Sequence, residues 1–182
     1  MILIFGLGNI GNEYNNTYHN IGFMCLDAFL KEHNLSLNKT KYNGNFLETK
    51  MFNEKVVFVK PTTYMNASGT CVLNFIKKFK ADISDILVIY DDYDINIGEV
   101  RYRNSGSSGT HNGMRDIVEK LQTEDFKRLR VGIRNNGPKI PIINYVLSKI
   151  KNKKDYEKVF EKTNLFIEDF IKNNGKAENV SL

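Results

Sequence analysis

The sequence has few of the residues that build cross-linked or membrane-bound structures. Among its 182 residues there is no tryptophan, and there are two cysteines and three prolines. No apolar run approaches the roughly 20 residues that a membrane-spanning helix requires, and no basic segment precedes the first apolar run, so we expect neither membrane contact nor a secretory signal. Cys25 and Cys71 form no C-x-x-C motif, so we expect both to be reduced core residues of a cytoplasmic protein.

Several enzyme motifs are also absent. The chain contains no G-x-S-x-G elbow for a serine nucleophile, and no H-E-x-x-H or clustered cysteine and histidine that would predict a metal site. Residues 6–11 match the G-x-G-x-x-G fingerprint of dinucleotide-binding proteins. That fingerprint requires a helix to begin within the glycines, whereas the polar residues 12–16 are typical of a loop. Nicotinamide or flavin binding is therefore the weaker interpretation.

The spacing of the apolar residues predicts an α/β fold. Hydrophobic residues make up 41% of the chain and charged residues 26%, which is an ordinary balance for a globular protein. Strands are expected over residues 1–5, 45–51, 55–60, 86–90, 99–103 and 128–133, and helices over residues 17–33, 67–79, 114–121, 140–150 and 156–171. A frayed tail is expected from Asn173. This order predicts a single domain over residues 1–182, with a mixed β-sheet flanked by helices on both faces.

The basic residues are unevenly distributed. The net charge is +5, a mild indication of a polyanionic partner, although surplus surface lysine explains the same sum. All six arginines lie in one stretch, at positions 101, 103, 115, 128, 130 and 134. Because the planar guanidinium fork matches phosphate oxygens two at a time, we expect this stretch to face phosphate groups.

Two of the three histidines stand in polar loops that follow predicted strands, each directly before an asparagine. These are His19 and His111. A histidine near its ordinary pKa can take a proton from water at neutral pH, and it does so best when a carboxylate holds its other ring nitrogen. Asp91 and Asp92, at the end of a predicted strand, are candidates for that carboxylate, and capping of the strand end is the alternative role.

No side chain resembles a covalent nucleophile, so water activated by histidine is the simplest hydrolytic mechanism. Asn9, Asn66 and Asn112 can supply amide donors to a carbonyl or to a developing oxyanion. For any one asparagine, turn formation is the commoner role. The residue types alone leave both roles open for each of the three.

Five segments occur in an order that is specific to one family. They are GLGNIGNEYNNTYHNIGF, KPTTYMNASG, YDDYDINIGEVRYR, SGTHNGMRDI and RLRVGI. Together with the chain length they closely resemble bacterial peptidyl-tRNA hydrolase. The resemblance implies a single α/β domain with a twisted mixed sheet and no metal or organic cofactor. It also implies hydrolysis of the ester that joins a peptide to the 3′ ribose of tRNA, by a monomer whose partner is the acceptor stem and 3′ end of peptidyl-tRNA.

The resemblance also implies roles for particular residues. It makes His19 the general base and Asp91 the residue that orients it. Asn9 would contact the main chain of the peptide and help to exclude aminoacyl-tRNA, which has a free cationic amine. Asn66 would hold the scissile carbonyl or the water. The remaining implied contacts with substrate or tRNA are Tyr14, Asn20, Tyr64, Met65, Arg101, Arg103, His111, Asn112 and Arg130.

The chain departs from the family pattern in two places. Gly109-Thr110 stands where the family often has paired glycines before its second His-Asn, and Tyr90 stands where histidine usually precedes the aspartate. Both changes can alter the shape of the cleft or its affinity for tRNA. The alternative function is a non-catalytic RNA-binding protein on the same scaffold, which would not require an intact His19 and Asp91.

Overall fold

The first apolar run of the chain forms the central strand of the sheet. This strand, β1 (Ile2–Gly6), is buried along its whole length. It pairs in parallel with β4 (Glu54–Pro61) on one side and with β5 (Ile86–Asn96) on the other. A continuous apolar sequence is what a strand covered on both faces requires. The computed structural model describes all 182 residues.

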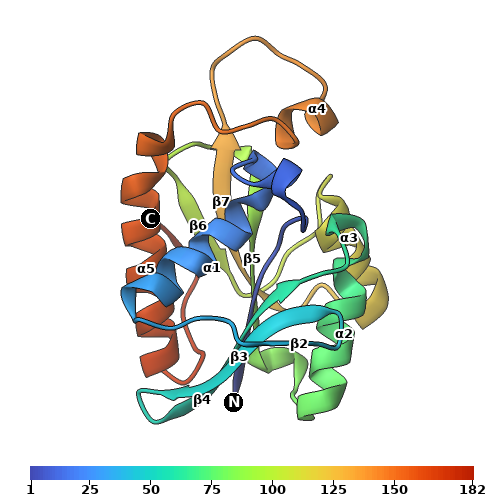
Figure 1. Cartoon of the computed structure of the whole chain (residues 1–182), viewed down its shortest axis with the longest axis vertical. Helices are drawn as coiled ribbons and strands as arrows, with labels where there is room; N and C mark the ends of the chain where they lie inside the picture. Colours follow the sequence, from blue (N-terminus) through green and yellow to red (C-terminus); the bar gives the residue numbers. More distant parts are fainter.

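Eight strands form one mixed sheet in the order β2-β3-β4-β1-β5-β7-β6-β8 (Figure 1). The central pairs β4–β1, β1–β5 and β5–β7 are parallel, and the pairs towards both edges are antiparallel. The remaining strands are β2 (Lys39–Lys41), β3 (Gly44–Met51), β6 (Val100–Arg103), β7 (Lys127–Arg134) and β8 (Val180–Ser181). The parallel centre aligns the carboxyl ends of four strands.

Helices cover both faces of the sheet. The helices α1 (Ile21–Glu32) and α5 (Glu157–Lys172) lie on one face, and α2 (Ser68–Phe79) and α3 (Asn112–Leu121) lie on the other (Figure 1). Each face has its own continuous apolar core. Burial of one large apolar side chain is worth about 1.5–3 kcal/mol, so these two cores hold the strands in place. The short helix α4 (Ile142–Val146) stands apart at one end of the sheet (Figure 1).

None of the helices combines the length and the apolar character that crossing a membrane would need. The two cysteines are free and buried, as expected. The predicted α/β fold, with a mixed sheet and helices on both faces, is confirmed.

The differences from the predicted elements lie at their ends. The helix α1 begins at Ile21 rather than at residue 17, because residues 12–20 contain two short 3₁₀ turns. This late start also confirms that no helix begins within the glycines of residues 6–11. The helix predicted over residues 140–150 is reduced to α4, because the chain beyond it pairs with an earlier loop. The strand β5 continues to Asn96, where it still pairs with β7.

Two short strands were not predicted. The strand β2 is exposed and contains only lysine and threonine, and β8 has two residues, so neither shows an apolar alternation. The expectation of a frayed tail is wrong, because β8 pairs with β6 and the Asn179 side chain accepts the backbone N–H of Asn104. Contacts between distant segments order this end of the chain.

Candidate active site

The polar loops that carry the predicted site residues meet at one edge of the sheet. The strands β1, β4 and β5 run parallel, so their carboxyl ends point to the edge at which open α/β sheets place their sites. The loop after β1 stays close to α1, because the Phe23 N–H donates to the carbonyl oxygen of Leu7. A Cβ at Gly22 would lie 2.4 Å from the carbonyl oxygen of Ile89. Glycine at this position therefore lets α1, and with it His19, lie directly against the sheet.

A cavity of about 550 Å³ opens at this edge. Its volume lies within the range of ligand sites in proteins. Most of the predicted site residues line it, namely Asn9, Tyr14, His19, Tyr64, Met65, Asn66, Asp91, His111, Asn112 and Arg130. The fold thus brings together side chains from both halves of the sequence.

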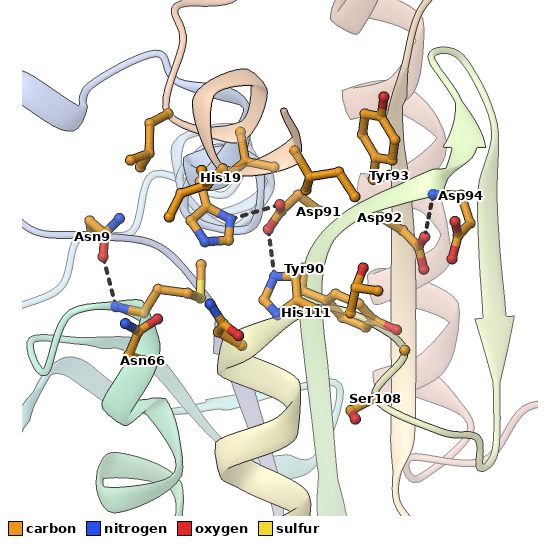
Figure 2. Close-up of a pocket in the computed structure, with 18 of the residues that line it drawn as sticks. Asn9, His19, Asn66, Tyr90, Asp91, Asp92, Tyr93, Asp94, Ser108 and His111 are labelled. Atoms are coloured by element: carbon orange, nitrogen blue, oxygen red, sulfur yellow. Dashed lines mark hydrogen bonds and ion pairs between the residues drawn. The ribbon is translucent and has the colours of Figure 1, made fainter. Parts of the chain in front are cut away.

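Asp91 lies between the two histidines of the cavity (Figure 2). One carboxylate oxygen bonds Nδ1 of His19 and the other bonds Nε2 of His111, at 2.8 Å in each case. Asp91 is 1% exposed and His19 is 9% exposed. The expected proximity of His19 and Asp91 is therefore found, and His111 is a second partner of the same carboxylate.

The hydrogen bonds determine which nitrogen of each ring is protonated. Nδ1 of His111 accepts the backbone N–H of Met114 at 3.1 Å, so Nε2 carries the proton that is donated to Asp91. When His19 is neutral, its proton lies on Nδ1, which faces Asp91, so Nε2 keeps a free lone pair and has no partner in the protein. Of the two histidines, only His19 can therefore accept a proton from a molecule in the cavity.

Burial and charge act in opposite directions on this cluster. Burial lowers the pKa of His19, but the charge of Asp91 and its hydrogen bond outweigh that effect, so the pKa lies above the ordinary value of 6.5. Burial raises the pKa of Asp91, but His19 and His111 together hold it far below the usual value for aspartate. Asp91 is therefore a carboxylate at neutral pH, and its charge stabilises the protonated form of His19.

The cluster is also compact enough for a metal ion, since one donor atom from each of His19, Asp91 and His111 lies within 4.8 Å of the others. A metal requires an unprotonated nitrogen from each histidine. His111 can offer Nε2 only if its proton moves to Nδ1, and Nδ1 already accepts the Met114 N–H. The donor set therefore fits a carboxylate shared by two protonated nitrogens better than it fits a metal site.

Asn9 presents a fixed hydrogen-bond donor to the cavity. Its Oδ1 accepts the backbone N–H of Met65 at 2.7 Å (Figure 2), so its amide nitrogen is free of partners in the protein. Tyr64 precedes this contact with a φ of 60° and a ψ of 163°, a conformation that residues other than glycine rarely adopt. The structure corrects the expectation that Asn20 contacts the substrate: it is 3% exposed, and both ends of its amide bond the backbone of Asn9.

The arginines do not form the single phosphate-facing surface that their clustering predicted. Arg128 is 1% exposed, so it cannot reach a phosphate group. Its guanidinium donates to the carbonyl oxygens of Ser107, Glu124 and Phe126. Through Ser107 it holds the glycine-rich loop that leads to His111. The expectation is wrong for this residue because the sequence does not reveal which arginines are buried.

Only one of the three arginines expected to contact tRNA lines the cavity. This is Arg130, whose Nε donates to the carboxylate of Asp92 at 2.8 Å. Asp92 therefore pairs with Arg130, and the carboxylate that holds the histidines is that of Asp91. Arg101 and Arg103 lie on β6 outside the cavity lining, and Arg103 donates to the carbonyl oxygen of Val180 on β8. Their contact with tRNA stays a prediction.

One wall of the cavity was not predicted. It is formed by the apolar side chains of α4 and its end, namely Ile142, Ile143, Val146 and Leu147. Ile143 is 63% exposed, although the run at residues 140–150 is apolar. Periodicity does not distinguish an apolar wall that faces a cavity from one that faces a core. The cavity therefore combines an apolar wall with convergent polar groups, as ligand sites commonly do.

Both departures from the family pattern lie at the cavity. Tyr90 is buried, and its ring meets the His111 ring edge-on with centroids 5.0 Å apart. Gly109 and Thr110 line the cavity on the loop before His111. Tyr90 therefore supports the second partner of Asp91 by packing, while Thr110 changes the cavity wall.

Known proteins resemble this chain in both sequence and fold. A sequence model of the family described as Peptidyl-tRNA hydrolase matches residues 3–181. A protein named Peptidyl-tRNA hydrolase from Clostridium botulinum is 44% identical over 162 residues, which cover 89% of this chain and 84% of that protein. One of the same name from Staphylococcus saprophyticus is 42% identical over 176 residues, with 96% and 93% covered. A crystal structure of peptidyl-tRNA hydrolase from Acinetobacter baumannii matches with a TM-score of 0.82 and 31% identity, over 96% of this chain and 92% of that chain.

The change Asp91→Asn should lower the pKa of His19. It removes the charge that raises this pKa and leaves burial, which lowers it. NMR titration of the imidazole Cε1–H signals measures the pKa in both proteins. His33, whose ring packs against Phe29 outside the cavity, serves as the internal control. An unchanged or raised pKa of His19 in the variant would contradict the assigned role of Asp91.

Proposed function

The chain belongs to the peptidyl-tRNA hydrolase family, and from this premise we propose that it cleaves the ester between a peptide and the 3′ ribose of tRNA with His19 as general base. One observation supports this mechanism above the others. Nε2 of His19 has no hydrogen-bond partner in the protein, while Nδ1 is held by the buried carboxylate of Asp91. The substrate is peptidyl-tRNA released from stalled ribosomes, and its cleavage recycles the tRNA.

The reaction begins when Nε2 of His19 takes a proton from water and the resulting hydroxide attacks the ester carbonyl carbon. The imidazolium forms beside the carboxylate of Asp91, whose charge stabilises it. The tetrahedral intermediate then collapses, the bond to the ribose 3′ oxygen breaks, and the proton passes from His19 to that oxygen. The products are a peptide with a free carboxyl group and a tRNA with a free 3′ hydroxyl.

Amide groups at the cavity stabilise the negative charge that develops on the carbonyl oxygen. The side chains of Asn66 and Asn112 line the cavity and are exposed to it. The helix α3 begins at Asn112, so the positive end of its dipole lies at the cavity as well. Donors that are already in place when the charge develops lower the barrier without a cost in reorganisation.

Asn9 lets the enzyme discriminate between peptidyl-tRNA and aminoacyl-tRNA. Its Oδ1 is occupied by the Met65 N–H, so it offers the cavity a donor and no acceptor. An N-acylated residue presents a carbonyl oxygen that accepts this hydrogen bond. The ammonium group of an aminoacyl-tRNA is a donor only, so it loses water at this position without gaining a partner.

The 3′ end of the tRNA passes Tyr14 and Tyr64, whose rings meet edge-on with centroids 6.3 Å apart in the cavity wall. Aromatic faces of this kind stack on unpaired bases. Arg101, Arg103 and Arg130 contact phosphates of the acceptor stem, which agrees with the net charge of +5. We expect the enzyme to act as a monomer in the cytoplasm and without a cofactor.

Replacing His19 by alanine should remove most of the turnover while the fold survives. General-base catalysis is worth about 10²–10⁴-fold, so kcat for N-acetylaminoacyl-tRNA should fall by at least about a hundredfold. The matched control His33→Gln, which lies outside the cavity, should keep the wild-type kcat. In the wild type, turnover should rise with pH through a value above 6.5, because only unprotonated His19 can act.

Near-normal turnover by the His19→Ala protein would rule out this mechanism. Binding of tRNA by a wild-type protein that cleaves no ester would instead favour the non-catalytic RNA-binding function.

The change Asn9→Asp should weaken the preference for the blocked substrate. Aspartate keeps an oxygen for the Met65 N–H and replaces the amide donor by a second oxygen, which repels a carbonyl and attracts an ammonium group. The ratio of kcat/KM for N-acetylaminoacyl-tRNA to that for aminoacyl-tRNA should fall at least about tenfold, because the free energy of one hydrogen bond to the blocked substrate is lost. Thermal unfolding of both proteins verifies that the fold is kept. An unchanged ratio would remove Asn9 from substrate discrimination.

A further inference from the structure

The loop at residues 12–18, which leads to His19, is fastened to the segment at residues 145–150, which includes the end of α4. The contacts that join their backbones are Tyr18 N–H to Ser148 O, at 3.2 Å, and Ile150 N–H to Asn16 O, at 2.8 Å. Thr17 and Lys149 face each other in the same antiparallel bridge. The loop that leads to the proposed base is therefore paired with the segment that contains Val146 and Leu147 of the apolar cavity wall.

The side chain of Lys149 extends this pairing. Its ammonium group donates to the carbonyl oxygen of Glu13 at 2.9 Å and to that of Asn15 at 2.5 Å. These carbonyls lie at a 3₁₀ turn (Asn12–Tyr14), which is too short to satisfy them within its own backbone. One cation therefore closes the turn from outside and ties it to the segment after α4.

An aromatic contact continues the connection to the sheet. Tyr18, directly before His19, stacks on Tyr145 with ring centroids 4.6 Å apart and planes inclined by 14°. The hydroxyl of Tyr145 donates to the carbonyl oxygen of Ile133 on β7. In addition to the backbone bridge, two side chains thus hold the loop at residues 12–18, the Lys149 ammonium at its start and the Tyr145 ring at its end.

We propose that Lys149 is a positioning residue for the hydrolytic reaction, because its ammonium group holds the loop at residues 12–18 so that Tyr14 and Nε2 of His19 keep their places at the cavity. The proposal rests on the proposed function, since the group it positions is the proposed base. Lys149 is not part of the cavity lining and acts only through the carbonyls of Glu13 and Asn15.

An exposed lysine near a tRNA-binding cavity also fits a simple phosphate contact, so the two roles have to be separated. Two of the three ammonium donors of Lys149 are used within the protein. Lys151, two positions further along, is exposed and makes no hydrogen bond through its side chain. Loss of a phosphate contact weakens tRNA binding and its salt dependence, whereas loss of a positioning contact lowers kcat.

The first test needs no substrate. The Lys149→Met variant keeps the length of the side chain and removes the ammonium group, and Lys151→Met removes the same charge without touching the loop. NMR follows the hydrogen-exchange rates of two backbone amides in and next to the loop. The Thr17 N–H donates to the carbonyl oxygen of Tyr14, and the Asn20 N–H donates to that of Thr17. Exchange should be at least about tenfold faster in Lys149→Met, because two charge-assisted hydrogen bonds to the loop are lost, and unchanged in Lys151→Met. Equal exchange in the two variants would overturn the proposal.

The second test measures kcat and KM for N-acetylaminoacyl-tRNA and for an N-acetylaminoacyl ester of adenosine, which has no phosphates. In Lys149→Met, kcat should fall about 10–100-fold on both substrates, as for a misplaced catalytic group, and the salt dependence of KM should match that of Lys151→Met. Lys149→Arg should restore most of kcat, because a guanidinium also donates to two carbonyls.

A loss confined to KM for the tRNA substrate, or the same kcat in Lys149→Met and Lys151→Met, would contradict the proposal. A wild-type protein that cleaves neither ester would refute the proposed function instead, and the exchange measurement would still decide whether Lys149 holds the loop.

Discussion

The buried carboxylate of Asp91 is the interaction on which the rest of the site depends. A charge that is 1% exposed is costly to remove from water, and the cost is offset only when its oxygens are hydrogen-bonded. Here one oxygen is bonded by His19 and the other by His111. Each ring is therefore placed by the same carboxylate, and displacement of either ring leaves a buried charge with half of its partners.

The two rings nevertheless differ in their ability to accept a proton from the cavity, and the difference comes from one backbone N–H. The Met114 N–H at the start of α3 occupies Nδ1 of His111, so that ring has no lone pair left for the cavity. His19 has no such neighbour at Nε2 and keeps a lone pair available. Because of this contact at the start of α3, neutral His19 can accept a proton from the cavity and His111 cannot. Tyr90 strengthens the support, because its ring packs against His111.

The fold was predictable from the sequence where the pattern is local. The buried strands show continuous or alternating apolar residues, and the segments resembling the family contain His19, Asp91 and Asn9, which the parallel strands bring to one cavity. The exposed strand β2 and the two-residue strand β8 carry no such pattern. They form because distant segments supply their hydrogen-bond partners.

The same distinction applies to single residues. Arg128 looked like a phosphate ligand, and only the packing shows that backbone carbonyls surround it. Asn20 looked like a substrate contact, and only the fold places both ends of its amide on Asn9. Lys149 had no distinguishing signal, because its partners lie in a loop far away in sequence. Residue type thus predicted which groups can do chemistry, and long-range contacts decided which of them face the cavity.

The central claim is that Nε2 of His19 activates the attacking water. The most direct measurement is a crystal structure of the protein with an adenosine analogue in which an amide replaces the scissile ester. We expect a water within about 2.6–3.2 Å of Nε2, placed to attack the carbonyl carbon, with Nδ1 still bonded to Asp91. A ring released from Asp91, or an Nε2 turned away from the carbonyl with no water between them, would contradict the account.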